Sequence, residues 1–187
     1  MDFQTLAAAL QAIAPDPAEK AARNAAHQQW ASIAKPLGSL GLLETALEDI
    51  AALTCSAEVA VTPRSVLMLC ADNGVVRQGV TQTDHTVTAA VTRNAGNNCS
   101  SVCKMAAVAG CRVVPVDMGI IDFPPTPNVL DGRLGNGTGD ITAGPAMTRE
   151  QAERGVLIGI DLVREQKKQG VLLLATGEMG IGNTTTS

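Results

Sequence analysis

Hydrophobic residues in the first third of the chain recur every three or four positions, which is the spacing of one face of a helix. This spacing predicts three helices, over residues 3–13, 18–31 and 40–54. Pro15 separates the first two helices, and the segment Lys35–Gly41, with one proline and two glycines, separates the last two. We therefore expect residues 1–58 to be a helical segment that belongs to a smaller second domain.

Short continuous apolar runs replace this spacing in the rest of the chain. Three runs have the length of a buried strand, namely Ser65–Cys70, Arg112–Asp117 and Val171–Thr176. An Ala- and Val-rich helical stretch that ends at Gly110 lies between the first two runs, and a helix over 148–169 precedes the third. Strands that alternate with helices of this length predict an α/β fold, with a doubly wound, mainly parallel, Rossmann-like sheet and flanking helices.

Three details refine this prediction. Thr148 and Gln151 have the spacing of a capping box, so we expect the helix to begin there. Pro115 lacks a ladder donor, which predicts an edge or irregular position in its strand. The connection 118–147 holds four prolines and six glycines, and it is either an ordered functional loop or a disordered insertion. We expect 59–187 to be an incomplete α/β nucleotide-binding domain, truncated after the third strand and its glycine-rich loop.

Composition excludes several classes of protein. Apolar residues make up 45% of the chain but aromatic residues only 2%, so the core must be aliphatic. The net charge of -4 and the few aromatic rings argue against a nucleic-acid partner. No apolar stretch approaches the ~20 residues that span a bilayer, and we expect a cytoplasmic protein. Of the five cysteines, Cys99 and Cys103 could share a metal site, but buried thiols are the favoured interpretation.

The segment Gly177–Ser187 reads G-E-M-G-I-G-N-T-T-T-S, which is typical of a phosphate-binding turn after a strand. Gly177, Gly182 and Thr184 match the ATP-binding pattern G-x-x-x-x-G-K-[ST], but Asn183 stands in place of its lysine. Without that cation the turn suits a monophosphate rather than a triphosphate. Asn183 or Thr184 would cap a helix that is absent, so we expect a chain cut in mid-fold.

Acidic residues follow each predicted strand. Asp72, Asp117 and Glu178 should meet at the rim where parallel strands end, and a Mg²⁺ site is one hypothesis for them. A second hypothesis concerns Glu178 alone. A carboxylate about 5 Å from a phosphate costs roughly 3 kcal/mol at an effective dielectric near 20, so Glu178 should bind a sugar diol instead. A nucleotide or sugar phosphate then fits this turn, although a solvent-facing Glu178 is the plain alternative.

Other polar residues near the rim have two readings each. Asp72 and Asn73 either contact a ligand or simply stabilise a turn after the strand. His85 is a candidate general base, but such a histidine is more often solvated. Arg133 and Lys35 could contact a substrate carboxylate or phosphate, and an exposed surface role is equally open.

Five segments together resemble the nicotinate-nucleotide--dimethylbenzimidazole phosphoribosyltransferase family. They occur in the order of that family and extend from about Lys35 to the end of the chain. The segments are Lys35–Glu44, Cys70–Thr83, Val116–Ile120, Gly137–Thr148 and Gly177–Thr186.

The resemblance implies an enzyme of cobalamin biosynthesis. Its reaction moves the 5-phosphoribosyl group of nicotinate mononucleotide to 5,6-dimethylbenzimidazole or a similar base, and gives alpha-ribazole 5'-phosphate. A pyridinium leaving group is its own electron sink, so this chemistry needs positioning and one base but no metal or cofactor. The resemblance also implies small-molecule substrates and a homodimer when full length.

Site residues carried over by position fall into two groups. The phosphoribosyl group is assigned Glu178, Gly180, Gly182, Asn183 and Thr184, and the side of the accepted base is assigned Asp72, Asn73, Gln82 and Thr83. Many members have Asp-His-Gly where this chain has Asp72-Asn73-Gly74. Some have Ser at Thr83 or Gln at Val91, so the accepted base stays open.

Members of the family are much longer than this chain, and their general base lies in a glycine-rich segment near their C-terminus. The resemblance therefore places no catalytic residue in this chain and puts the general base beyond Ser187. We expect the isolated chain to be inactive and poorly soluble, because three strands leave an unpaired sheet edge and an apolar face. The alternatives are a non-catalytic module that binds a nucleoside monophosphate and a nucleotide-dependent kinase, the latter opposed by Asn183.

Overall fold

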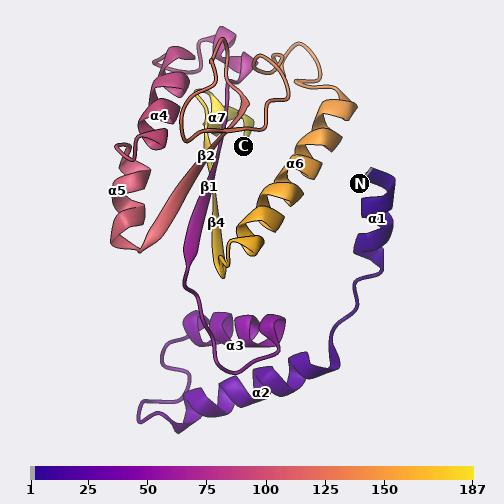
Figure 1. Ribbon diagram of the computed structural model, residues 1–187, viewed down its shortest axis with the longest axis vertical. Helices are drawn as coiled ribbons and strands as arrows, with labels where there is room; N and C mark the ends of the chain where they lie inside the picture. The colour runs from indigo at the N-terminus through magenta and orange to yellow at the C-terminus, as the bar shows by residue number, and fades with distance from the viewer. Residues whose placement is uncertain (1–2) are drawn as a thin grey trace. The chain divides into compact units, whose positions relative to one another are not determined.

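The structure, a computed structural model, describes residues 3–187, and the chain divides into two compact units between Val61 and Thr62. The first unit is helical, and the second is a parallel sheet with helices on both faces (Figure 1). No helix among residues 3–187 combines the length and the apolar character that a membrane span needs.

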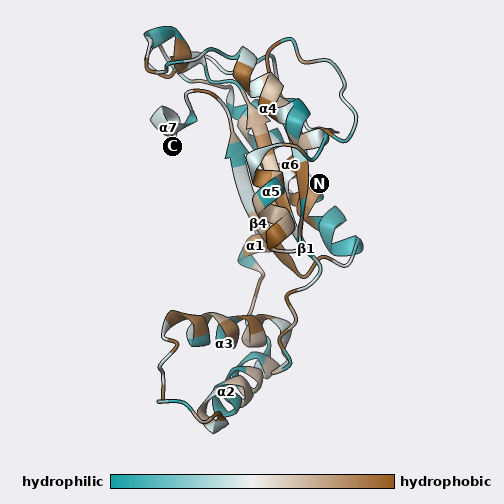
Figure 2. Ribbon diagram, turned by 90° about the vertical axis from the view of Figure 1, so that its left-hand side faces the viewer, coloured by the Kyte–Doolittle hydropathy of each residue, from teal (hydrophilic) through white to brown (hydrophobic). Residues whose placement is uncertain are grey.

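The first unit contains three helices, α1 (Phe3–Gln11), α2 (Pro17–Ser32) and α3 (Leu42–Thr54). A capping box starts α2, because Asp16 accepts a 2.8 Å hydrogen bond from the N–H of Ala18 and Glu19 accepts one of 2.9 Å from the N–H of Asp16. Helices α2 and α3 pack together, with alanines buried on both. Along α3 several leucines stay uncovered, and Leu53 is 81% exposed (Figure 2).

The turn before α3 is closed by an ion pair. The ammonium group of Lys35 lies 2.8 Å from Oε1 of Glu44, and the two side chains are only 13% and 10% exposed. Glu44 also accepts a 3.1 Å hydrogen bond from the N–H of Leu40, and the Lys35 ammonium lies 5.9 Å from the centre of the Trp30 ring. Lys35 therefore pairs with Glu44 inside its own unit, which disfavours a role for it in binding a substrate.

Acid is expected to weaken this unit through Glu44. The hydrogen bond from Lys35, followed by that from Leu40, lowers the pKa of Glu44 below its ordinary value. A carboxylate with a lowered pKa stabilises the fold above its unfolded pKa, and that contribution is lost as the pH falls through the folded pKa. The urea midpoint, followed by the fluorescence of Trp30, should therefore fall less steeply below pH 5 in Glu44→Gln than in the wild type. The exposed Glu58→Gln is the control, and equal pH dependence of the Glu44 variant and the wild type would contradict this assignment.

The second unit is built on a four-stranded sheet. Its strands are β1 (Arg64–Ala71), β2 (Cys111–Gly119), β3 (Leu130–Asp131) and β4 (Leu173–Met179), in the order β3-β2-β1-β4. All pairs are parallel, so the predicted fold class is confirmed. Helices α4 (Thr86–Gly96) and α5 (Ser101–Val108) cover one face, and α6 (Arg149–Lys168) lies on the other (Figure 1). The chain winds away from β1 in both directions, which makes the carboxyl ends of β1 and β4 the expected ligand site.

The core lies between the sheet and helices α4 and α5. Met68, Val113 and Ala106 belong to it, and Cys70 is fully buried there. Burial raises the pKa of the Cys70 thiol to about 11, so this thiol stays neutral. Cys103 is also buried, as expected, whereas Cys99 is exposed and contradicts the expectation of a buried thiol.

The helical stretch after β1 is interrupted, contrary to the prediction. Asn97 and Asn98 end α4, and Asn98 has a left-handed φ of 56°, a conformation that asparagine tolerates better than most residues. A 3₁₀ helix, η1 (Gly74–Gln78), precedes α4.

The long connection 118–147 is ordered and contains β3, a strand that the sequence did not predict. Within residues 3–187, β3 pairs with Val116 and Asp117 of β2 alone. Contrary to the prediction of an edge strand, β2 has neighbours on both sides, but Pro115 lies opposite Met68 of β1 and just outside the stretch paired with β3.

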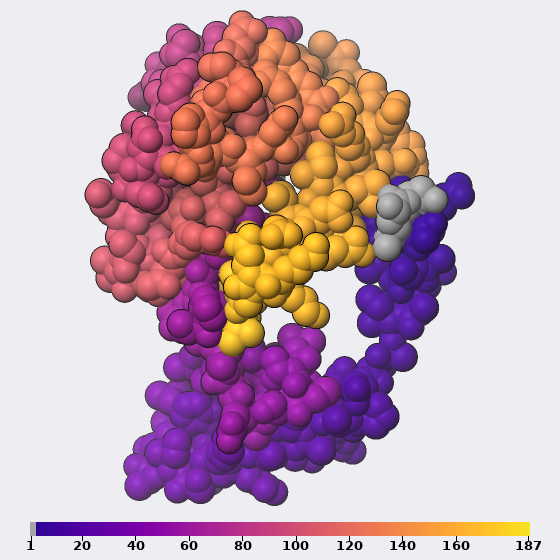
Figure 3. Space-filling view, viewed as in Figure 1, coloured from indigo at the N-terminus to yellow at the C-terminus, as the bar shows by residue number. Residues whose placement is uncertain are grey.

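Helix α6 begins as predicted. Oγ1 of Thr148 accepts a 3.1 Å hydrogen bond from the N–H of Gln151, and Oε1 of Gln151 accepts one of 2.9 Å from the N–H of Thr148. Val156 and Val163, however, are each 48% exposed. β4 has a neighbour on one side only among residues 3–187, and it lies at the molecular surface (Figure 3, yellow). The expected open edge and exposed apolar face are therefore present.

Candidate substrate-binding site

The glycine-rich turn is shorter than the sequence indicated. β4 extends through Met179, so Gly177 and Glu178 belong to the strand, with Gly177 opposite Met68 of β1. Pairing with β1 thus extends the strand past its apolar residues. The turn proper is Gly180–Gly182.

A helix follows this turn, although the sequence suggested that it was missing. Helix α7 (Asn183–Thr186) has four residues, and its N-cap is Gly182 rather than Asn183 or Thr184. Gly182 has a φ of 88°, a left-handed conformation that a residue with a Cβ adopts at a cost. The expected capping residues therefore lie inside the helix instead.

The turn packs directly against the end of β1. A Cβ atom on Gly180 would lie 2.1 Å from the carbonyl oxygen of Ala71 and 2.8 Å from Nδ2 of Asn73. Such distances leave no space for a side chain, so only glycine fits at this position.

Two side chains hold the turn in place. Nδ2 of Asn73 donates a 3.2 Å hydrogen bond to the carbonyl oxygen of Ile181, and the hydroxyl of Thr186 donates one of 3.3 Å to Oδ1 of Asn73. The N–H of Ile181 donates a 3.1 Å hydrogen bond to Oγ1 of Thr88, which is fully buried in α4. Sequence reasoning missed Thr88. Its signal was a pair of polar residues, Thr88 and Thr92, one turn apart in an apolar helix.

Asp72 lies beneath the long connection rather than at the surface. It is 2% exposed, and its Oδ2 accepts a 2.8 Å hydrogen bond from the N–H of Ile121. Its N–H donates to the carbonyl oxygen of Gly119, and its own carbonyl oxygen accepts from the N–H of Thr138. Oδ1 of Asp72 is buried without a hydrogen-bond partner among residues 3–187. These contacts match the turn-stabilising reading of Asp72, and contact with a base stays a prediction.

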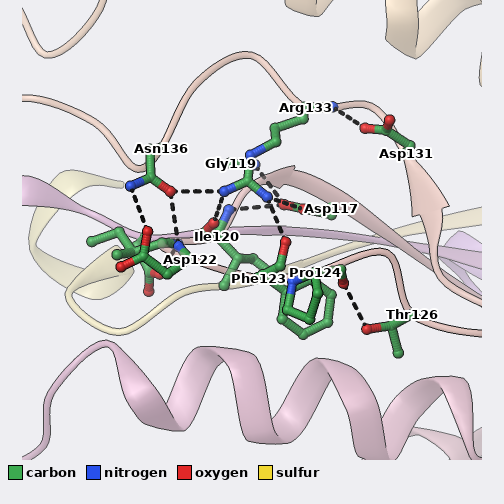
Figure 4. Close-up of polar contacts among 12 residues, drawn as sticks. Asp117, Gly119, Ile120, Asp122, Phe123, Pro124, Thr126, Asp131, Arg133 and Asn136 are labelled. Carbon is green, nitrogen blue, oxygen red and sulfur yellow. Dashed lines mark hydrogen bonds and ion pairs between the residues drawn. The ribbon is translucent and has the colours of Figure 1, made fainter.

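Asp117 and Arg133 bind each other. Oδ1 of Asp117 accepts hydrogen bonds of 2.9 and 2.8 Å from the N–H groups of Gly119 and Ile120, and its Oδ2 lies 3.0 Å from Nη1 of Arg133 (Figure 4). Arg133 is therefore occupied within the protein and is not free for a substrate.

The magnesium hypothesis is wrong for this arrangement. Within residues 3–187 no three His, Cys, Asp or Glu side chains come close enough together to hold a metal ion. Asp72, Asp117 and Glu178 thus do not gather at one point, and Cys99 and Cys103 do not belong to such a group either.

Glu178 lies beside both the turn and a cavity. Its carboxylate accepts a hydrogen bond from the side-chain amide of Asn183. The cavity of about 380 Å³ is lined by both apolar and polar residues, a combination that suits a flat heteroaromatic ring. The apolar residues include Met68, Val91, Val102 and Met179, and the polar ones include Asn94, Cys99, Ser101 and Glu178.

The remaining candidates lie elsewhere. Gln82, Thr83 and His85 are exposed in the segment between η1 and α4, and none of them lines this cavity. Thr184 is exposed, and its hydroxyl donates a 3.3 Å hydrogen bond to Oδ1 of Asn183. The structure thus brings together Asn73, Glu178, Asn183 and the two glycines of the turn.

Comparison with known proteins identifies the family of this chain. A family model described as a phosphoribosyltransferase matches residues 15–187. The nicotinate-nucleotide--dimethylbenzimidazole phosphoribosyltransferase of Acetivibrio thermocellus is 42% identical over 156 residues, which are 83% of this chain and 44% of the relative. The protein of the same name from Salmonella paratyphi A is 40% identical over 184 residues, 98% of this chain and 51% of the relative.

Solved structures of this family have the same fold as the chain. The crystal structure of CobT from Thermus thermophilus superposes with a TM-score of 0.82 at 34% identity, over 88% of this chain and 50% of that one. This chain thus spans about half the length of the relatives that it matches.

Proposed function

The chain belongs to the phosphoribosyltransferase family, which is the family of the nicotinate-nucleotide--dimethylbenzimidazole phosphoribosyltransferases that it resembles. We propose that it takes part in the reaction for which these relatives are named. In this reaction the 5-phosphoribosyl group of nicotinate mononucleotide passes to 5,6-dimethylbenzimidazole or a similar base and gives alpha-ribazole 5'-phosphate for cobalamin biosynthesis. The substrates are small molecules, and a cytoplasmic homodimer is part of the same proposal.

The position of Glu178 carries this proposal. Its carboxylate adjoins the cavity and also binds Asn183 at the glycine-rich turn. We propose that the ribose binds at Glu178, with the heteroaromatic ring in this cavity and the phosphate at Gly180–Asn183. Asn183, which stands where a kinase would have lysine, is held by a carboxylate, and this contact disfavours a triphosphate at the turn.

The chemistry requires one bond to form and one to break at C1' of the ribose. A nitrogen of the incoming base attacks C1', and the bond between C1' and the pyridinium nitrogen breaks as its electron pair leaves with nicotinate. The N–H proton of the attacking base goes to a general base. We propose that Glu178 and the turn hold the phosphoribosyl group in position, and that a carboxylate outside this chain accepts the proton.

Glu178→Gln is expected to weaken the binding of nicotinate mononucleotide by roughly tenfold. Hydrogen bonds to a charged group contribute about 1.5–3 kcal/mol, and the neutral amide retains part of this stabilisation. Isothermal titration calorimetry with the purified chain measures the change. Glu150→Gln, on the exposed first turn of α6, is the matched control and should bind as the wild type does.

Two outcomes would overturn the proposal: absence of binding by the wild-type chain, or equal affinity of Glu178→Gln and the wild type. Adding 5,6-dimethylbenzimidazole and following alpha-ribazole 5'-phosphate by chromatography separates catalysis from binding alone. Binding without product is the outcome expected for this chain by itself, since the proton acceptor is assigned to a residue outside it.

A further inference from the structure

Arg133 gathers four acceptors around one guanidinium group, three from the long connection 118–147 and one from Asp117 of β2. Its Nη1 donates to Oδ2 of Asp117 at 3.0 Å and to the carbonyl oxygen of Phe123 at 2.8 Å. Its Nη2 donates to Oδ1 of Asn136 at 2.8 Å and to the carbonyl oxygen of Ile120 (Figure 4). All four protons on the two terminal nitrogens are engaged. We call this arrangement, Arg133 with Asp117, Ile120, Phe123 and Asn136, the arginine clasp.

The clasp fixes the backbone that holds Asp72. Asp117, bound to Arg133, accepts the N–H groups of Gly119 and Ile120. The carbonyl oxygen of Gly119 accepts a 3.1 Å hydrogen bond from the N–H of Asp72, and the N–H of Ile121 donates to the Asp72 carboxylate. The backbone N–H and the side-chain carboxylate of Asp72 are therefore both hydrogen-bonded to the segment that Arg133 holds in place.

The next residue connects this segment to the site. Asn73 follows Asp72 directly and bonds Ile181 and Thr186 on either side of Gly182. The segment after Arg133 supports the same place, since Oγ1 of Thr138 accepts a 3.1 Å hydrogen bond from the N–H of Gly74. A continuous series of contacts thus runs from Arg133 through Asp117, Gly119, Asp72 and Asn73 to the glycine-rich turn.

We propose that Arg133 is a positioning residue for the glycine-rich turn, acting through Asp72 and Asn73 without touching the substrate. That the turn holds the phosphoribosyl group rests on the proposed function, whereas the coupling between Arg133 and the turn does not. The planar fork of arginine suits this task, because lysine offers a single ammonium that cannot span four acceptors in fixed directions.

Hydrogen exchange tests the coupling without any ligand. In Arg133→Gln the amide of Ile181 is expected to exchange about tenfold faster, a change within the usual range of coupling between distant sites. The paired segments 66–69 of β1 and 174–177 of β4 should keep their wild-type exchange rates. Arg149→Gln is the control, because the Arg149 side chain is 85% exposed and its ion-pair partner among residues 3–187 is Glu153 of the same helix.

The pattern of exchange decides between positioning and general stability. Faster exchange at 72–74 and 180–186 with an unchanged strand ladder supports the proposal. An unchanged turn, or an equal rise throughout the unit, overturns it. Where Arg133→Gln does not fold, Arg133→Lys retains the charge beside Asp117 and should show a smaller rise at Ile181. Wild-type exchange at Ile181 in that variant would overturn the proposal too.

Affinity for nicotinate mononucleotide gives a second, independent measure. Arg133→Gln should raise the dissociation constant about tenfold in the wild-type background, but less than about twofold when Asn73 is already alanine, because both changes break one series of contacts. A tenfold rise of the dissociation constant in both backgrounds would show that Arg133 and Asn73 are not coupled. If the wild-type chain does not bind this nucleotide, the proposed function fails, and the exchange experiment still decides the role of Arg133.

Discussion

Gly180→Ala is expected to abolish binding of nicotinate mononucleotide and to lower the free energy of unfolding by at least about 3 kcal/mol. The added methyl group would lie 2.1 Å from the carbonyl oxygen of Ala71, which is far inside van der Waals contact. That oxygen belongs to the backbone of the central strand, so neither atom can move aside by changing a rotamer. The turn must leave β1, and the hydrogen bonds from Asn73 and to Thr88 then lose their geometry.

Gly177→Ala is the matched control for this change. It lies three residues earlier, on β4, where the nearest atom to an added Cβ is 3.7 Å away. A strand glycine replaced by alanine without a clash should change stability by no more than about 1 kcal/mol, and in the favourable direction. Urea denaturation followed by circular dichroism gives both values, and calorimetry gives the affinities. Similar stability and affinity in the two variants would show that the turn does not rest on β1 as described.

Asp117→Ala is expected to cost about 3 kcal/mol of unfolding free energy, because it removes the carboxylate of a largely buried ion pair. The Asp117 side chain is 9% exposed and that of Arg133 is 30% exposed. Loss of the carboxylate leaves the N–H groups of Gly119 and Ile120 without their acceptor and the Arg133 cation with uncharged acceptors. Asp117→Asn keeps an oxygen for the two N–H groups, so its effect should fall between those of the wild type and the alanine variant.

Asp161→Ala provides the comparison for Asp117→Ala in the same urea experiment. Asp161 pairs with Arg164 on the surface of α6, and their side chains are 75% and 50% exposed. Exposed pairs contribute at most about 1 kcal/mol. If Asp117→Ala costs no more than Asp161→Ala, the arginine clasp does not stabilise the unit.

Much of the α/β unit could be predicted because its signals are local. The apolar runs at Ser65–Cys70 and Arg112–Asp117 identify buried strands wherever they occur, and Thr148 with Gln151 caps a helix from within one turn. These features depend on neighbours in the sequence. The parallel order of the strands then follows from the helices between them.

The features that the sequence missed depend on distant partners. Gly177 and Glu178 read as part of a turn, but pairing with Met68 and Leu69 extends β4 through them. β3 has only two residues and exists because Val116 and Asp117 offer a free edge. No periodicity can reveal either event.

The candidate site shows the same limit. Glu178, Asn183 and Gly182 could be proposed from their type and spacing, and Gly180 from the resemblance to the family. Arg133, in a segment rich in proline and glycine, reads as an exposed cation, and only its four acceptors in the folded chain reveal its place. The depth at which Asp72 is buried could not be read either, because turn residues of the same type are usually exposed.

The pairing of β4 with β1 bears on the order in which this protein folds during synthesis. Arg64 and Leu173 are neighbours in the sheet although more than a hundred residues separate them in the chain. When a ribosome has completed β2, the pair β1–β2 can already form, but the other edge of β1 must wait for more than fifty further residues. Contacts of such long range are slow to form, and an unpaired central strand is open to other chains meanwhile. Within the described residues, the candidate site at the edge of β1 that pairs with β4 is therefore completed only after the β1–β2 pair can form.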